Sequence, residues 1–164
     1  MKSLFRCPVC GGPLDREERV YRCADRHSYD IAKEGYTYLL PPNQKHSAAP
    51  GDDKGMAAAR WAFLSKDYYA PLRDALCSIA LANTGPAPSV LDTGCGEGYY
   101  TAQVLHTLQQ QGRASSVCGV DISRDALICA HRRAPELSLA VASIAHLPVA
   151  DASCDLLLNV FAPH

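Results

Sequence analysis

The feature that most constrains the fold is a glycine loop between an apolar strand and a helix. The run VLDTGCGEGYY at residues 90–100 places Gly94, Gly96 and Gly98 after apolar residues and before a segment of helical composition. Glycines let the backbone turn tightly and approach a ligand, and a helix that begins there offers free N–H groups. Asp121 follows the next predicted strand, 23 residues past Gly98. A carboxylate there can accept hydrogen bonds from both hydroxyls of a ribose.

Strand and helix patterns alternate along the second half of the chain. We expect strands at 89–94, 116–123, 137–143 and 154–162, and helices at 56–66, 71–82, 99–111 and 124–134. Ser123 is the expected N-cap of the last helix. This alternation predicts an α/β fold with a parallel, Rossmann-like sheet of βαβ units.

The spacing of the glycines narrows the choice of cofactor. The dinucleotide fingerprint is G-x-G-x-x-G, whereas this loop is G-x-G-x-G with Asp92 two residues before the first glycine. The tighter spacing and the preceding acid resemble motif I of the class I S-adenosylmethionine-dependent methyltransferases. A dinucleotide fold and a purely structural glycine turn remain as alternatives.

The stretch VASIAHLPVADASCDLLL resembles the same family further along the chain. Many of its members carry an acid before LPF and a following strand that begins FDL or FDV. Ser143 stands where that acid would be, beside Ile144. The resemblance implies that Ile144 packs on the adenine face of the cofactor, and the alternative is an ordinary surface loop.

The N-terminal region carries a separate cluster of metal-binding residue types. Cys7, Cys10, Cys23 and His27 follow the pattern C-x₂-C-x₁₂-C-x₃-H. Two such pairs, brought together by a hairpin, supply the four N or S ligands of a structural zinc site. A redox C-x-x-C and coincidence are the alternatives, and CADRHSYD is too short for the ligand helix of a C₂H₂ finger.

Composition limits the possible partners and locations. The chain has 164 residues and a net charge of −1, with no long apolar run and no recognisable signal sequence. We expect a cytoplasmic protein with reduced cysteines and with no membrane or DNA partner. Residues 1–50 carry eight Lys and Arg against six Asp and Glu, a balance of +2 that fits an RNA-facing module.

We expect two modules joined by a linker. Residues 1–40 form the zinc-binding RNA-recognition module, and residues 56–164 form the N-terminal part of a Rossmann-like methyltransferase domain. Residues 41–55, PPNQKHSAAPGDDKG, are rich in Pro, Gly, Ser and Asp, which is typical of a linker or mobile loop.

The order of several phrases makes the resemblance specific. After CPVC…C…H come YDIAKEGYTYLLP, PGD, an R-x-x-FL helix, YAPLRDAL and LDTGCGEGYY. Together they resemble the RlmA-type 23S ribosomal RNA (guanine-N1)-methyltransferases over essentially the whole chain. The resemblance implies an enzyme of the EC 2.1.1 class, usually a homodimer, that transfers a methyl group to N1 of a guanine in a hairpin loop of 23S rRNA.

The same resemblance implies roles for individual residues. Zinc ligands would be the four residues of the Cys/His cluster. Cofactor contacts would be Tyr69, Asp92, Gly94, Gly96, Glu97, Gly98, Asp121 and Ile144. No catalytic base is identified, and Asn159 is a weak candidate for orienting the target base, or equally a strand-end cap. Apart from the resemblance, we hypothesise that the zinc module docks RNA through the arginines that crowd around the ligands and contact phosphates, namely Arg6, Arg16, Arg19, Arg22 and Arg26.

The family's methyltransferase domain continues past the point where this sequence stops, at NVFAPH. We therefore expect a fragment or a truncated product, inactive or weakly active alone, with an apolar open edge after the last strand. Two rival functions remain: a non-enzymatic zinc-ribbon interaction module with a degenerate methyltransferase remnant, and a small-molecule methyltransferase with an unrelated zinc module.

Overall fold

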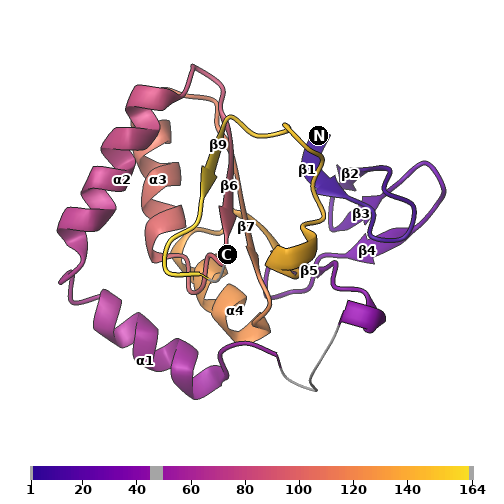
Figure 1. Cartoon of the computed structure of the whole chain (residues 1–164), viewed down its shortest axis with the longest axis horizontal. Coiled ribbons are helices and arrows are strands. Elements are labelled where there is room, and N and C mark those ends of the chain that lie inside the picture. The colour runs from indigo at the N-terminus through magenta and orange to yellow at the C-terminus, as the bar shows by residue number, and fades with distance from the viewer. Residues whose placement is uncertain (1, 45–49, 163–164) are drawn as a thin grey trace.

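The structure, a computed structural model, describes residues 2–44 and 50–162. Four short strands form an antiparallel N-terminal sheet in the order of the chain. They are β1 (Lys2–Arg6), β2 (Pro13–Glu17), β3 (Val20–Arg22) and β4 (Ser28–Asp30). Figure 1 shows this small sheet beside the larger one, on the side away from the helices α1 and α2.

The larger sheet has five parallel strands in the order β5-β8-β7-β6-β9. These strands are β5 (Tyr36–Tyr38), β6 (Ser89–Thr93), β7 (Ser116–Asp121), β8 (Ser138–Val141) and β9 (Leu156–Leu158). The predicted α/β fold with a parallel sheet is therefore confirmed. Because the strands are parallel, their carboxyl ends lie at one edge, where ligands bind in open sheets of this kind.

In the described part of the chain, four α-helices accompany the parallel sheet. They are α1 (Lys54–Leu64), α2 (Ala70–Asn83), α3 (Tyr99–Gln110) and α4 (Arg124–Arg133), and two 3₁₀ turns lie at η1 (Pro42–Gln44) and η2 (Ile144–His146). The side chains of Asp53 and Ser123 accept N–H bonds at the starts of α1 and α4, as N-caps do. Ser123 thus caps α4 as predicted, while α1 begins two residues earlier than predicted because Asp53 supplies its cap.

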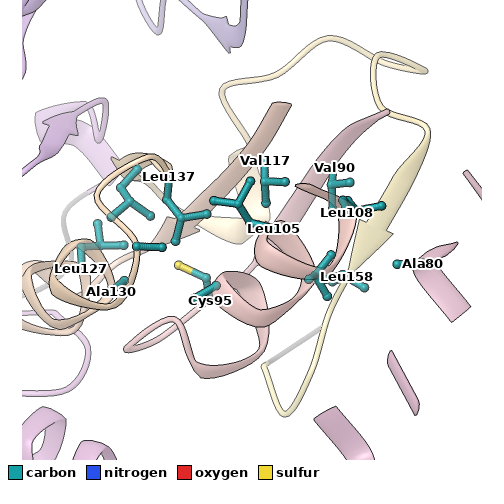
Figure 2. Packing of buried hydrophobic residues seen from close by; sticks show 14 of the residues in the cluster. Ala80, Val90, Cys95, Leu105, Leu108, Val117, Leu127, Ala130, Leu137 and Leu158 are labelled. Atoms are coloured by element: carbon teal, nitrogen blue, oxygen red, sulfur yellow. The ribbon is translucent and has the colours of Figure 1, made fainter. Parts of the chain in front are cut away.

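The helical face of the sheet carries the first core. Side chains at alternate strand positions, such as Val90, Val117 and Leu139, pack against Leu105 and Leu108 of α3. Figure 2 shows the side chains of Val90, Val117, Leu105 and Leu108 among those that meet between the helices and the strands. Since successive strand residues point to opposite faces, the residues between them must be covered by something else.

The other face of the sheet is covered by the N-terminal module. Leu91, Cys118 and Ala140 share a buried cluster with Phe5 and Tyr21, whose rings meet edge to face at 5.7 Å. Apolar burial of this kind is the main stabilising contribution between packed layers. The N-terminal sheet and the parallel sheet therefore share one core.

Main-chain bonds tie the N-terminal module to the segment before β9. The N–H of Arg6 donates to the carbonyl oxygen of Pro148 at 2.7 Å, and Phe5 forms an antiparallel bridge with Val149. Further along, β5 pairs in parallel with β8. The predicted residue limits of the two modules stay a prediction, but this pairing puts a strand from residues 1–40 into the larger sheet.

Two features differ from the sequence-based expectations. The predicted strand 154–162 is wrong in length, because only Leu156–Leu158 is strand, and Phe161 has a φ of 57° that no strand residue adopts. The edge strand β5 was not predicted, since three residues of YTY are too short to show alternation. Leu157 on the edge strand β9 is 52% exposed, which agrees with the expected apolar edge.

No helix in residues 2–44 and 50–162 has the length and apolar composition that crossing a membrane requires.

Candidate cofactor cavity and metal centre

The glycine loop lies where β6 leaves the sheet and α3 begins. Gly94, Gly96 and Gly98 all have positive φ, at 75°, 55° and 78°. The N–H groups of Gly94 and Cys95 both donate to the carbonyl oxygen of Val120 on the neighbouring strand, at 2.8 and 3.0 Å. The left-handed conformation explains why glycine occupies these places, and the space in front of Gly96 is open for a ligand.

Asp121 holds this loop from the end of β7. Its carboxylate accepts N–H bonds from Gly96 at 2.9 Å and from Ser123 at 2.8 Å. Burial raises the pKa of Asp121, and the N–H bonds from Ser123 and Gly96 oppose that rise. The carboxylate thus faces the cavity with acceptor capacity remaining for the hydroxyls of a ribose.

Asp92 lies deeper, at the end of β6. It is 2% exposed, and the hydroxyl of Thr101 on α3 donates to its Oδ2 at 2.5 Å. Burial raises the pKa of Asp92 to about 6, although the Thr101 bond favours the ionised form. This carboxylate therefore joins the loop to α3 and closes the floor of the cavity.

These residues line a cavity of about 630 Å³, within the usual size range of small-molecule sites. The predicted residues that line it are Tyr69, Asp92, Gly94, Gly96, Glu97, Asp121 and Ile144. Gly98 does not line it; a Cβ there would come within 2.9 Å of the Ala130 Cβ, so this glycine allows α4 to pack closely. Asn159 follows β9 on an exposed position outside the lining, so its role stays a prediction.

The opposite wall comes from residues that the sequence reasoning missed. Gly51, Asp52 and Arg60 line the cavity, although the first two fall in the predicted linker. Gly51 has a φ of 81° and packs against Ile122, while the Asp52 carbonyl oxygen accepts a 2.5 Å bond from the Ser123 hydroxyl. The signal that could have found them is PGD followed by an N-cap Asp, which marks an ordered turn leading into a helix.

The mouth of the cavity is aromatic. Tyr69 meets Phe161 edge to face at 5.9 Å and Phe63 at 6.0 Å, and Tyr100 lies 6.5 Å from Phe161. Phe161 is 73% exposed. Aromatic faces beside a cofactor cavity suit a planar, unstacked base, because every base has a π-face to stack.

The four Cys and His side chains of the N-terminal module converge. Their ligand atoms all lie within 4.8 Å of one another. The Cys10 and Cys23 sulfurs are 3.6 Å apart, and His27 Nδ1 lies 3.3 Å from the Cys23 sulfur and 3.6 Å from the Cys7 sulfur. Tetrahedral zinc with bonds of about 2.3 Å to sulfur and 2.0 Å to nitrogen places neighbouring ligands roughly 3.5 to 3.8 Å apart, so the set fits zinc.

Two tight turns present these ligands. The Cys7 N–H donates to the Gly12 carbonyl oxygen at 2.8 Å, and Gly11 has a φ of 70°. In the second turn the Cys23 N–H donates to the His27 carbonyl oxygen at 3.1 Å, and Arg26 has a φ of 65°. The hairpin of β2 and β3 brings the two turns together.

Tyr29, which the sequence reasoning did not identify, supports the site from β4. Its hydroxyl oxygen lies 3.1 Å from the Cys7 sulfur. Burial opposes ionisation of Cys7, but this contact and backbone hydrogen bonds lower the pKa of its thiol to about 6. The thiolate is the form that binds zinc, so Tyr29 favours the ligand state of Cys7.

Four of the five predicted RNA-contacting arginines are exposed, and Arg6 is half-buried. Arg16 and Arg19 line a hollow of about 120 Å³ with Lys33 and His131. Arg22 forms an exposed ion pair with Glu17 at 3.1 Å. Arg16, Arg19 and Lys33 therefore lie together where the N-terminal module meets α4.

Comparison with known families matches both parts of the chain. Residues 5–48 match the zinc-ribbon family described as RlmA, N-terminal, and residues 90–164 match the family described as methyltransferase domain. The two predicted cofactors, zinc and S-adenosylmethionine, accompany these two kinds of module. A solved structure described as a candidate S-adenosylmethionine-dependent methyltransferase from Methanococcus maripaludis aligns with a TM-score of 0.55 at 19% identity, over 72% of this chain and 55% of that one.

Curated relatives match nearly the whole chain. The 23S rRNA (guanine(748)-N(1))-methyltransferase of Streptomyces fradiae is 38% identical over 97% of this chain and 55% of its own length. A candidate 23S rRNA (guanine-N(1)-)-methyltransferase of Bacillus subtilis is 31% identical over 98% of this chain and 57% of its own. The chain thus spans a little over half the length of the relatives it matches.

These comparisons agree with the resemblance seen in the sequence. They give an RlmA-type N-terminal zinc ribbon, a methyltransferase domain after it, and relatives with substantial sequence identity. The chain thus carries an N-terminal zinc ribbon of the RlmA kind followed by a methyltransferase domain, and over nearly its whole length it is similar to part of curated 23S rRNA (guanine-N1)-methyltransferases.

Proposed function

We propose that this chain takes part in the transfer of a methyl group from S-adenosylmethionine to N1 of a guanine in a hairpin loop of 23S rRNA. It would act as a transferase of the EC 2.1.1 class. The observation that carries the proposal is the cavity at the carboxyl ends of β6 and β7, walled by the glycine loop and Asp121 and open through an aromatic mouth. The zinc ribbon packed on the same sheet supplies a second surface for the RNA.

In this proposal the residues of the cavity hold and orient the cofactor. Asp121 accepts the ribose hydroxyls, the N–H groups of the glycine loop face the amino-acid part, and Ile144 packs on the adenine. When bound, S-adenosylmethionine supplies an electrophilic methyl group on a sulfonium. Orientation of this kind accounts for much of the acceleration in such transfers, because it replaces an encounter in solution by a fixed approach.

The substrate demands more than the cofactor cavity. Guanine N1 carries a proton at neutral pH, and this proton must leave as the methyl group arrives. The base must also leave its stack to reach the cavity. We propose that the aromatic mouth receives the unstacked guanine, and that Asn159, next to β9, bonds its edge.

The zinc ribbon is proposed to grip the RNA, with zinc held by Cys7, Cys10, Cys23 and His27. A closed set of four ligands leaves no open position, so the metal is structural. The exposed arginines around it would contact phosphates without reading sequence. We also propose that the protein acts in the cytoplasm, where its rRNA substrate is found. We further propose that it forms a homodimer, which light scattering after size-exclusion chromatography would test.

The deciding experiment uses 23S rRNA from a strain that lacks the full-length gene as methyl acceptor. The chain is incubated with this rRNA and labelled S-adenosylmethionine, and digested nucleosides are identified by mass spectrometry. Appearance of N1-methylguanosine at one site supports the proposal, with rRNA from the parent strain as the unreactive control. If the chain transfers a methyl group only to a free metabolite, or binds no cofactor at all, the proposal is wrong.

A further inference from the structure

Arg133, the last residue of α4, binds the glycine loop at Glu97 in two ways. Its Nε donates to the Glu97 carboxylate at 2.5 Å and to the Glu97 main-chain oxygen at 3.2 Å. The Glu97 side chain is 1% exposed and that of Arg133 is 16% exposed. A buried carboxylate without a partner is strongly unfavourable, so this pair allows Glu97 to stay ionised beside the cavity.

The same guanidinium also reaches helix α1. Its Cζ lies 3.9 Å from the ring centroid of Trp61, and its NH2 group donates to the Ser65 hydroxyl at 3.2 Å. The distance to the Trp61 ring is typical of a cation–π contact. Trp61 is the single tryptophan of the chain, so this contact has a spectroscopic reporter of its own.

Arg133 therefore connects two walls of the cavity. Glu97 belongs to the wall made by the glycine loop, while Arg60, Phe63 and Leu64 of α1 belong to the opposite wall. One turn earlier on α4, Ala130 packs on Gly98 at the end of the same loop. We propose that Arg133 is a positioning residue that holds α1 and the glycine loop at the spacing S-adenosylmethionine requires. This inference rests on the proposed function, in which S-adenosylmethionine occupies the cavity.

No other cationic side chain near Glu97 can take over the ion pair that Arg133 forms with it. Burial raises the pKa of Glu97. Arg133 is the main group that lowers it, and the main-chain N–H of Tyr99 and then Arg60 of α1 contribute less. Arg60 is already paired with Asp52 at 3.0 Å. The other titratable neighbours are Tyr100, Cys95 and Cys129, which do not become cationic. Loss of Arg133 would leave Glu97 with a still higher pKa.

The test measures S-adenosylmethionine binding to the full chain by titration calorimetry. Arg133→Gln should weaken binding roughly tenfold, the size of a coupling between contacting buried groups. The affinity of Arg133→Lys should lie between those of Arg133→Gln and the unmutated chain, because lysine keeps the charge but loses the planar guanidinium and its stacking on Trp61. Arg132→Gln, an exposed neighbour on the same helix, removes the same charge and should bind as the unmutated chain does.

Two further readouts separate positioning from general damage. First, the dissociation constant of Arg133→Gln relative to that of the unmutated chain should rise as the pH is lowered. Without Arg133 the Glu97 carboxylate takes up a proton at a higher pH, and it then no longer favours the cationic cofactor. Arg133→Lys should show no such rise. Second, Trp61 emission should change in Arg133→Gln but stay unchanged in Arg132→Gln.

A double-mutant cycle shows whether Arg133 acts through Glu97. In a Glu97→Gln background, Arg133→Gln should have much less effect, and the pH-dependent ratio should disappear. If Arg133→Gln binds S-adenosylmethionine as tightly as the unmutated chain does, the inference is overturned. If Arg133→Gln does not fold, the inference is overturned when Arg133→Lys shows unchanged affinity and unchanged Trp61 emission. Absence of binding by the unmutated chain would instead overturn the proposed function.

Discussion

Asp121 and Gly96, 25 residues apart, are joined by a 2.9 Å hydrogen bond from the glycine N–H to the carboxylate. This bond fixes the middle of the loop to the end of β7. The other oxygen of the same carboxylate accepts the N–H of Ser123, the cap of α4. One side chain thus sets the loop, the next strand and the following helix relative to one another.

Replacing Asp121 should therefore weaken cofactor binding. Asp121→Ala removes both the anchor of the loop and the proposed acceptor for the ribose. We expect S-adenosylmethionine affinity to fall at least about tenfold, since hydrogen bonds to charged groups contribute roughly 1.5–3 kcal/mol. Calorimetric titration measures the change. Asp151→Asn, in an exposed turn, serves as the control, and an equal loss there would contradict the assignment.

The stability of the fold should depend on pH through Asp92. Its folded pKa of about 6 lies above the ordinary 3.8, so the folded state binds this proton more tightly than the unfolded state. The group therefore destabilises the fold above pH 6, and that effect disappears as the pH falls towards 4. Asp92→Asn should raise stability at pH 8 by about 1–3 kcal/mol and lose this advantage near pH 4.

Denaturant unfolding at pH 8 and pH 4 measures this effect, with Thr101→Val as the comparison. That variant removes the 2.5 Å bond to Asp92 and should destabilise the fold at pH 8. Because Asp92 lines the cavity, Asp92→Asn should also weaken cofactor binding, so that stability and binding change in opposite directions. A stability of Asp92→Asn that equals the unmutated value at pH 8 would refute the prediction.

Removing zinc should destabilise both sheets. Phe5, Cys7 and Tyr21 of the N-terminal module share a buried cluster with Leu91 and Val120 of the parallel sheet. We expect Cys23→Ser to lose bound zinc and to lower the Tm of the whole chain by about 10 °C or more, since metal binding is coupled to folding.

Atomic absorption and thermal unfolding followed by far-ultraviolet circular dichroism measure both effects. Cys129 lies on α4 and outside the zinc cluster, so Cys129→Ser should keep the metal and show only a small change in Tm. An unchanged Tm after metal loss would show that the two modules are energetically independent.

The exposed arginines of the N-terminal module should control RNA affinity. Replacing Arg16, Arg19 and Arg26 by Ala should weaken binding of a 23S rRNA hairpin and reduce the slope of log K against log salt by about 0.7–0.9 per lost phosphate contact. Filter binding at several salt concentrations measures this slope. Lys66→Ala with Arg124→Ala, both exposed and away from the zinc ribbon, are the control, and an unchanged slope in the triple variant would exclude these contacts.

The sequence by itself determined the helices and most strands of the parallel sheet, and it predicted several residues that the structure brings to the cavity. Alternation of apolar runs and helical segments predicted the parallel sheet, because those periods follow directly from backbone geometry. Gly94, Gly96 and Asp121 could be identified because a glycine loop and a carboxylate at the end of the next strand have fixed places in such a sheet. The zinc cluster was equally readable, since its ligand types and spacing are short-range features of the chain.

The tertiary structure decided what covers the sheet and what closes the cavity. Residues 1–40 cannot be recognised as a layer from sequence, because packing of Phe5 and Tyr21 on the parallel sheet depends on contacts distant along the chain. The same holds for Arg133 and Glu97, which lie 36 residues apart and form an ion pair only after α4 packs beside the glycine loop. Such contacts follow from the fold, so no local pattern announces them.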